Sequence, residues 1–218
     1  MKTRWLQTAC LVMAVLLISP TLISAQESKP VQLPQPQMDI GRPLMQVLKD
    51  RKSSRAFSNQ KLSSQVLSNM LWAAFGVNRP ESGRRTAPSA RNWQEIDIYV
   101  ATADGVSLYD AKAHALMPVV TEDIRALTGQ QPFVQEAPVN LVYVADFSRM
   151  GEAEKDVKVF CSAADTGVIT QNVYLYCASE GLATVVRGLI DRPALEQAMK
   201  LRPDQKVTLS QSVGYPKK

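Results

Sequence analysis

The apolar run Val139-Asn-Leu-Val-Tyr-Val-Ala145 predicts a buried strand, and its density of apolar side chains indicates a central place in a sheet. Beyond it, residues 154–181 carry the longest helical pattern of the chain, which Gly181 ends. One stripe of this helix holds Phe160, Ala164, Gln171, Leu175, Ala178 and Leu182. This strand and this helix form the expected centre of the fold.

Two helices are expected before the strand. Pro43 suits the first turn of one helix. A second helix, capped by Ser63 or Ser64, ends at Gly76. Residues 78–92 have the Gly, Pro and polar content of a loop.

Strands and short helices alternate through the rest of the chain. Residues 96–101 and 106–109 predict a hairpin around the turn signal Asp104-Gly105. Thr121 is expected to cap a short helix that ends at Gly129.

After the long helix, residues 184–186 predict a short strand, Pro193 starts a last helix and residues 206–213 form a final strand. Helices and strands therefore interleave within one domain, which indicates an α+β or α/β fold.

The composition excludes several classes of protein. The chain has 218 residues, a net charge of +5, one histidine and three cysteines. These numbers argue against a disordered chain, a disulfide scaffold and a His-rich metal site. His114 lies in the expected hairpin segment without an acid-base partner, so we interpret it as a surface residue. Cys161 and Cys177 fall on one helix, about 24 Å apart at its rise per residue, and cannot pair.

Residues 1–25 have the layout of a secretory signal peptide: Lys2 and Arg4, an apolar run and a small-residue stretch that ends at Ala25. Cleavage after Ala25 would make the protein periplasmic or secreted, without stable membrane association; the alternative is an uncleaved anchor. The charge then falls to +3, which is too mild for a nucleic-acid partner. Residues 26–42 read as a Pro-rich linker, and residues 43–218 form the domain.

Two polar stretches are candidates for ligand binding. Three cations and two hydroxyls lie within Arg51-Lys-Ser-Ser-Arg55, a set that suits a phosphate through charge-assisted hydrogen bonds. Pro88-Ser-Ala-Arg-Asn-Trp-Gln94 could present amide donors and acceptors to a planar heterocycle. The plain alternatives are a solvated charged corner and an ordinary polar loop. Gln171-Asn172 in the long helix is a third candidate, for which the plain alternative is a hydrogen-bonded core pair.

Five motifs resemble, in the same order, those of the FMN-dependent nitroreductase family. They are Arg51-Lys-Ser-Ser-Arg-Ala-Phe57, Leu67-Ser-Asn-Met-Leu-Trp-Ala-Ala-Phe-Gly76, Arg85-Thr-Ala-Pro-Ser-Ala90 with Asn92 and Gln94, Gln171-Asn-Val-Tyr-Leu175 with the turn after it, and Val213-Gly-Tyr-Pro216. The third motif is similar to the subgroup that includes the dehydrogenases of thiazole and oxazole peptide biosynthesis.

The resemblance implies a three-layer α+β sandwich with a mixed, largely antiparallel sheet, and a homodimer with FMN at the subunit interface. By that resemblance Arg51, Ser53 and Arg55 would hold the phosphate and ribityl chain, and Lys52 would add backbone contacts. Relatives commonly complete the phosphate site with a cation beyond the Gly-Tyr-Pro turn, where this chain has only Lys217 and Lys218.

Six further residues would approach the flavin ring by the same resemblance. Pro88, Ser89 and Ala90 would come from the partner subunit, Asn92 would hydrogen-bond the ring edge, and Arg187 and Gly188 would place backbone groups near N5. Variable loops over the ring would fall at residues 77–87 and 129–137.

The implied function is an exported FMN-dependent oxidoreductase that transfers hydride to a small organic acceptor. In relatives the donor is NADH or NADPH, and the flavin carries the redox chemistry, so no catalytic side chain and no metal site is predicted. The donor outside the cytoplasm and the natural substrate stay open. The alternative is a non-catalytic protein that binds flavin or a similar ligand on the same fold.

Overall fold

The computed structural model describes residues 29–217, so the expected signal peptide and its cleavage site lie outside the described residues. The central element is β7 (Val139–Asp146), in which every residue is buried. It lies inside a seven-stranded sheet of order β1-β6-β5-β4-β7-β9-β8, in which each neighbouring pair is antiparallel. The central position expected for this strand is confirmed.

The strands of this sheet have the following bounds: β1 Val31–Gln32, β4 Ile96–Thr102, β5 Gly105–Asp110, β6 Ala115–Val120, β8 Ala183–Arg187 and β9 Gln205–Gly214. Gly105 opens β5 with a φ of 121°, a conformation that the predicted hairpin turn requires of a glycine. A separate two-stranded hairpin consists of β2 (Val77–Arg79) and β3 (Arg84–Arg85).

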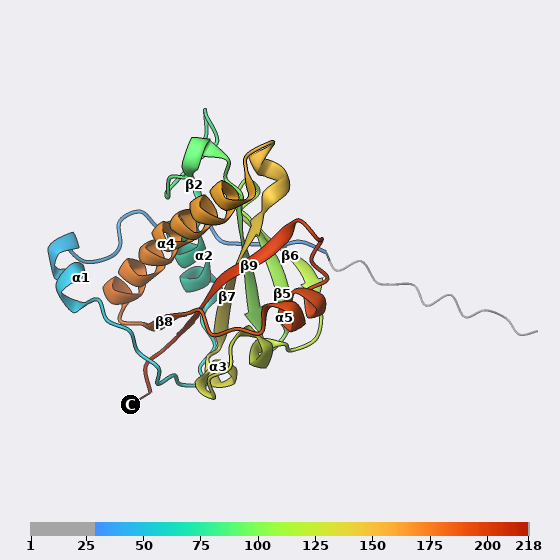
Figure 1. Ribbon diagram of the computed structural model, residues 1–218. Helices are drawn as coiled ribbons and strands as arrows, with labels where there is room; N and C mark the ends of the chain where they lie inside the picture. The colour runs from blue at the N-terminus through green and yellow to red at the C-terminus, as the bar shows by residue number, and fades with distance from the viewer. Residues whose placement is uncertain (1–28, 218) are drawn as a thin grey trace, which may run out of the picture.

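One face of the sheet is covered by α2 (Ser64–Phe75) and α4 (Lys155–Glu180), which lie on its left side in Figure 1. Met70, Leu71 and Phe75 of α2 and Ile169, Val173 and Cys177 of α4 pack there against Ile98, Leu141 and Tyr143 of the sheet. The other face is covered by α5 (Arg192–Ala198), through Leu195 and the adjacent Met199. These three layers confirm the expected α+β sandwich.

Helix boundaries follow the capping residues that the sequence offers. Ser63 caps α2 by accepting a hydrogen bond from the Val66 amide, and Gly76 ends that helix. Gly181 ends α4 in the left-handed conformation, with a φ of 70°. The first helix, α1 (Leu44–Asp50), begins directly after Pro43.

The expected helix that starts at Thr121 is wrong. The chain instead forms a short 3-10 helix, η2 (Arg125–Thr128), preceded by Ile124, and no side chain caps it. Asp123 binds the Arg125 side chain and amide, so the turn is organised by that pair. The short α3 (Phe133–Glu136) follows, and a further 3-10 helix, η3 (Phe147–Met150), comes directly after β7.

The described part of the Pro-rich arm before residue 43 lies against the domain. β1 pairs with β6, and Leu33 is buried in the core. His114 holds this arm, and its interpretation as a surface residue is wrong. The Nε2 atom lies 2.7 Å from Ser68 Oγ and 3.1 Å from the Pro34 carbonyl oxygen, and Nδ1 lies 2.9 Å from the Tyr109 hydroxyl. Burial lowers the pKa of His114, which keeps it a neutral structural residue.

The expected apolar stripe of α4 is not the buried one. Phe160, Ala164 and Gln171 are exposed, and Phe160 keeps 74% of its surface accessible. The buried line is Ser162, Asp165, Thr166, Ile169, Thr170, Val173 and Cys177. Small polar residues can take this position because the helix satisfies them: Thr166 Oγ1 donates to the Ser162 carbonyl and Thr170 Oγ1 to the Gly167 carbonyl.

Both remaining cysteines, Cys161 and Cys177, are free thiols, as their shared helix predicts. Within residues 29–217, no helix has the length and apolar character needed to cross a bilayer.

Candidate functional site

The polar stretch of residues 51–55 forms an irregular loop between α1 and the strand-like contact of Phe57 with Pro216. The Ser54 amide donates to the Thr184 carbonyl at 2.9 Å, which fixes the loop along the start of β8. Lys52, Ser53 and Arg55 are exposed, and Arg51 is half-buried. The loop therefore presents its cations and hydroxyls outward from a fixed backbone.

Tyr174 of α4 lies at the centre of this loop, and the sequence analysis did not single it out. Its hydroxyl lies 2.8 Å from Ser53 Oγ and accepts a 3.0 Å hydrogen bond from the Val186 amide. The Arg51 guanidinium carbon lies 5.3 Å from the centre of the Tyr174 ring, within cation–π range. The signal was present: Tyr174 is inside the motif Gln171-Asn-Val-Tyr-Leu175.

The cations of this loop lack ion-pair partners. Among residues 29–217, no carboxylate lies within salt-bridge distance of Arg51, Lys52 or Arg55, whereas eight other ion pairs form elsewhere. The end of the chain runs beside the same loop, because the Lys217 amide donates to the Ala56 carbonyl at 3.2 Å (Figure 1). Three unpaired cations with a hydroxyl between them fit the donor set that a phosphate group needs.

The second expected segment, Pro88 to Gln94, is not an ordinary loop. It contains a 3-10 turn, η1 (Ala90–Asn92), and three non-glycine residues with positive φ: Arg91 at 49°, Asn92 at 57° and Gln94 at 49°. Such conformations cost free energy and persist only where the surroundings enforce them. Pro88 and Asn92 are exposed, while Ser89 and Ala90 are half-buried.

Several hydrogen bonds hold the segment in this shape. The Ala90 amide donates to Asp165 Oδ2 of α4 at 2.8 Å, and the Gln94 amide donates to Ser89 Oγ at 3.0 Å. The Gln94 side chain accepts from Arg85 Nε at 2.8 Å and donates to Asn92 Oδ1 at 3.1 Å. The segment is therefore anchored to α4 on one side and to β3 on the other.

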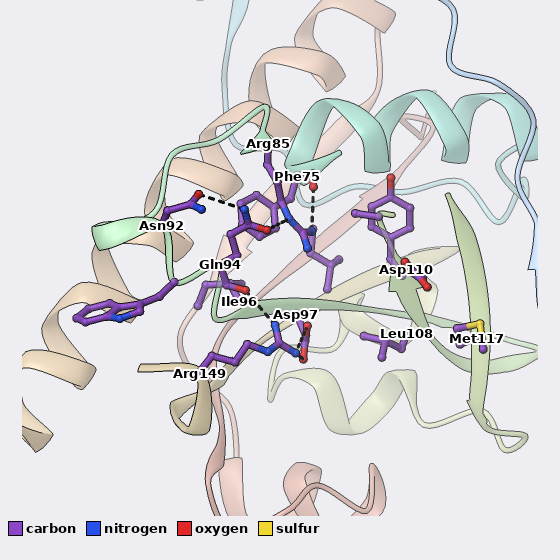
Figure 2. A pocket seen from close by; sticks show the side chains of 14 residues that line it. Phe75, Arg85, Asn92, Gln94, Ile96, Asp97, Leu108, Asp110, Met117 and Arg149 are labelled. Carbon is purple, nitrogen blue, oxygen red and sulfur yellow. Dashed lines mark hydrogen bonds and ion pairs between the residues drawn. The ribbon is translucent and has the colours of Figure 1, made fainter. Parts of the chain in front are cut away.

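A pocket of about 500 Å³ opens beside this segment (Figure 2). Phe75, Ile98, Leu108 and Met117 give it an apolar lining, and Arg149 binds both oxygens of Asp97 at its edge, at 2.7 and 2.8 Å. Burial raises the pKa of Asp97, and the Arg149 charge opposes that effect. Burial also lowers the pKa of Arg85, whose guanidinium stacks on the Phe75 ring at 4.5 Å.

Arg187 ends β8 with a buried side chain, only 4% of which is accessible. Its guanidinium donates to the Thr128 carbonyl at 2.7 Å and to Asn140 Oδ1 at 2.9 Å, while Nε has no hydrogen-bond partner in the described part of the chain. Burial lowers the pKa of Arg187 to about 10. The Arg187 side chain therefore holds the start of the loop at Thr128 and Gly129 against the sheet. Gly188, the next residue in the chain, is exposed.

The structure brings the predicted residues together in two groups rather than one. Arg51, Ser53 and the end of β8 meet at Tyr174, whereas the Pro88–Asn92 segment meets α4 at Asp165. These two anchors, Asp165 and Tyr174, lie nine positions apart on the helix, about 13.5 Å along its axis. Gln171 is exposed, and Asn172 donates to the Ala74 carbonyl at 3.3 Å as a helix-to-helix contact.

The chain resembles known proteins along most of its length. The model of the nitroreductase family matches residues 48–215. A protein of Methanocaldococcus jannaschii that carries the name nitroreductase is 31% identical over 169 residues, which cover 73% of this chain and 85% of that protein. The FMN reductase (NAD(P)H) of Bacillus subtilis is 24% identical over 155 residues, which cover 66% of this chain and 53% of that enzyme.

A solved structure agrees with these sequence matches. A protein of Ralstonia eutropha, described as a nitroreductase, superimposes with a TM-score of 0.84 at 43% identity. The match covers 88% of this chain and 92% of that chain.

Proposed function

The chain belongs to the nitroreductase family of oxidoreductases, and from that premise we propose that it uses FMN to transfer hydride to a small organic acceptor. The loop of residues 51–55 carries this proposal, because its cations have no ion-pair partner among residues 29–217 and its backbone is fixed. Arg51, Ser53 and Arg55 would hold the phosphate and ribityl chain, and Lys52 would contribute its backbone. FMN, when bound, would supply the hydride chemistry.

The chain's own residues then have the task of positioning. The Tyr174 hydroxyl lies at hydrogen-bond distance from Ser53, and its ring contacts the Arg51 guanidinium. These contacts would preorganise the donors for phosphate before a ligand binds. The backbone of Arg187 and Gly188 would face N5, and the Arg187 side chain holds that strand end through Thr128 and Asn140. No side chain of this site is assigned as an acid or base.

A homodimer is part of the proposal, because the two groups of residues lie apart within one chain. Asn92 and the Pro88–Ala90 stretch would reach the flavin of the partner subunit. The exposed face of α4 supports this arrangement: Val157, Phe160 and Val168 each keep between 39% and 74% of their surface accessible. An apolar helix face of this kind is suited to pack against a second copy.

Export and the electron donor belong to the same proposal. Residues 1–25 would direct the protein to the periplasm or the medium, where NADH and NADPH are not supplied as in the cytoplasm. We therefore expect a different donor to reduce the enzyme there. The Arg85-Thr-Ala-Pro-Ser-Ala90 motif favours the subgroup that includes the dehydrogenases of azole peptide synthesis.

Flavin content tests the proposal directly. The purified protein should show the visible absorbance of bound FMN, or acquire it when FMN is added. The double variant Arg51→Ala with Arg55→Ala should lose it, whereas a control with Lys112→Ala and Lys155→Ala, two exposed lysines elsewhere, should keep it. A wild-type protein that stays colourless with added FMN would overturn the proposed function.

A further inference from the structure

Glu95 is a carboxyl group buried where no cation neutralises it. Its side chain is fully inaccessible, at 0% exposure, and neither carboxyl oxygen has a hydrogen-bond partner among the described residues. It directly follows the strained segment that ends at Gln94 and directly precedes β4. A buried, unpaired carboxylate is costly, so this group calls for an explanation.

The groups that face Glu95 come from α4. They are the carboxyl of Asp165 and the hydroxyl of Ser162. The charged residues of the neighbouring elements are engaged elsewhere: Arg149 of η3 with Asp97, Asp146 of β7 with Arg202, and Lys158 of α4 with the Gly151 carbonyl. Burial, and the nearby Asp165 carboxylate, raise the pKa of Glu95 to about 7.

Asp165 connects the surroundings of Glu95 to the Pro88–Asn92 segment. Its Oδ2 accepts the 2.8 Å hydrogen bond from the Ala90 amide, and it is the α4 side chain that holds the segment. The positive-φ residues that follow Ala90, namely Arg91, Asn92 and Gln94, need such an anchor, because their backbone conformation is unfavourable on its own.

We propose that the buried Glu95 holds a proton beside the Asp165 carboxyl group and thereby positions the Pro88–Asn92 segment. With Glu95 neutral, nothing from this side repels Asp165 from the Ala90 amide, and the bond between them secures the strained turn. When Glu95 releases its proton to water, two carboxylates face each other in a dry site and repel. The repulsion displaces the Asp165 side chain, and the segment loses its anchor to α4.

The consequence for the cofactor rests on the proposed function. If Asn92 and its neighbours contact flavin, then deprotonation of the pair weakens FMN binding and gives the enzyme a pH-dependent affinity. Glu95 and Asp165 are positioning residues in this account, because neither touches the flavin.

Hydrogen exchange at the Ala90 amide, followed by NMR on the purified full chain, tests the pair. After correction for the intrinsic pH dependence of exchange, the wild-type rate should rise about tenfold or more between about pH 6 and about pH 8. Glu95→Gln, which keeps the shape of a neutral Glu95, should remove the rise and leave the amide protected throughout. Glu152→Gln, at an exposed glutamate, should behave as wild type.

Two results would overturn the proposed role of Glu95 and Asp165. One is an equal pH profile in wild type and Glu95→Gln. The other needs no variant: a ¹³C titration of the wild-type carboxyl groups in which none changes charge near pH 7. FMN affinity, measured across the same pH range, separates this inference from the proposed function. If Glu95→Gln changes the pH dependence of exchange at the Ala90 amide while FMN affinity does not depend on pH, the anchoring role of Asp165 is supported. The contact between the Pro88–Asn92 segment and flavin is then rejected.

Discussion

The hydroxyl of Tyr174 lies 2.8 Å from Ser53 Oγ, across 121 residues of sequence, and also receives the Val186 amide at 3.0 Å. One phenol therefore joins the long helix, the cationic loop and the edge strand β8. The loop owes its fixed shape to this contact and to the bond between the Ser54 amide and the Thr184 carbonyl.

Tyr174→Phe should weaken FMN binding without unfolding the protein. The variant keeps the ring under Arg51 but loses the bonds to Ser53 and Val186, which together stabilise the loop by about 1.4 kcal/mol. That loss corresponds to an approximately tenfold higher Kd, measurable by titration of flavin fluorescence. Tyr176→Phe is the matched control, because it removes a bond on the same helix, to the Val66 carbonyl, away from the loop. Equal affinities in the two variants would contradict the role of Tyr174.

Gly129→Ala should destabilise the fold through Arg187. A Cβ atom on Gly129 would lie 1.9 Å from Arg187 Nη1, which donates to the Thr128 carbonyl. The glycine has an extended backbone, so the expected cost of about 1–3 kcal/mol in unfolding free energy is steric. Urea denaturation measures it. Gly188→Ala, whose Cβ would meet only Leu209 at 3.6 Å, should stay within about 0.5 kcal/mol of wild type.

The stability that Glu95 contributes should fall as pH rises. Its pKa is raised from 4.5 in the unfolded chain to about 7 in the folded one, so the folded chain retains a proton that the unfolded chain has released. Between these two values the unfolding free energy of wild type, relative to Glu95→Gln, should drop by about 1.4 kcal/mol per pH unit. Above about pH 7 both states are ionised and the difference becomes constant. A difference that does not change across this window would contradict the buried, protonated carboxyl.

Phe160→Glu should shift the protein from dimer to monomer. The Phe160 side chain is 74% exposed on the apolar face of α4, and a charge there would be buried against a second copy. Light scattering coupled to size exclusion measures the molar mass. Val119→Glu places the same charge on an exposed valine of β6, and should leave the mass unchanged. A Phe160→Glu protein that remains a dimer would exclude this face as the interface.

Much of the fold was readable from local sequence, because its causes are local. Ser63, Gly76 and Gly181 set helix ends through hydrogen bonds and backbone freedom that involve only adjacent residues. The cations of residues 51–55 are consecutive, so their proximity needed no tertiary information. In the same way, the apolar run of residues 139–145 predicted the central strand.

Tertiary structure decided the orientation of α4 and the pairs that span the chain. An apolar stripe of helical period has the same appearance whether it faces the core or a second surface, so Phe160 was placed on the stripe that proved to be exposed. The contacts of Tyr174 with Ser53 and of Asp165 with Ala90 join residues 121 and 75 positions apart. Such contacts depend on how whole elements pack, and no spacing within the sequence encodes them. The sequence by itself determined most of the elements and the residue types that we propose for phosphate binding, and packing determined which partners fix them.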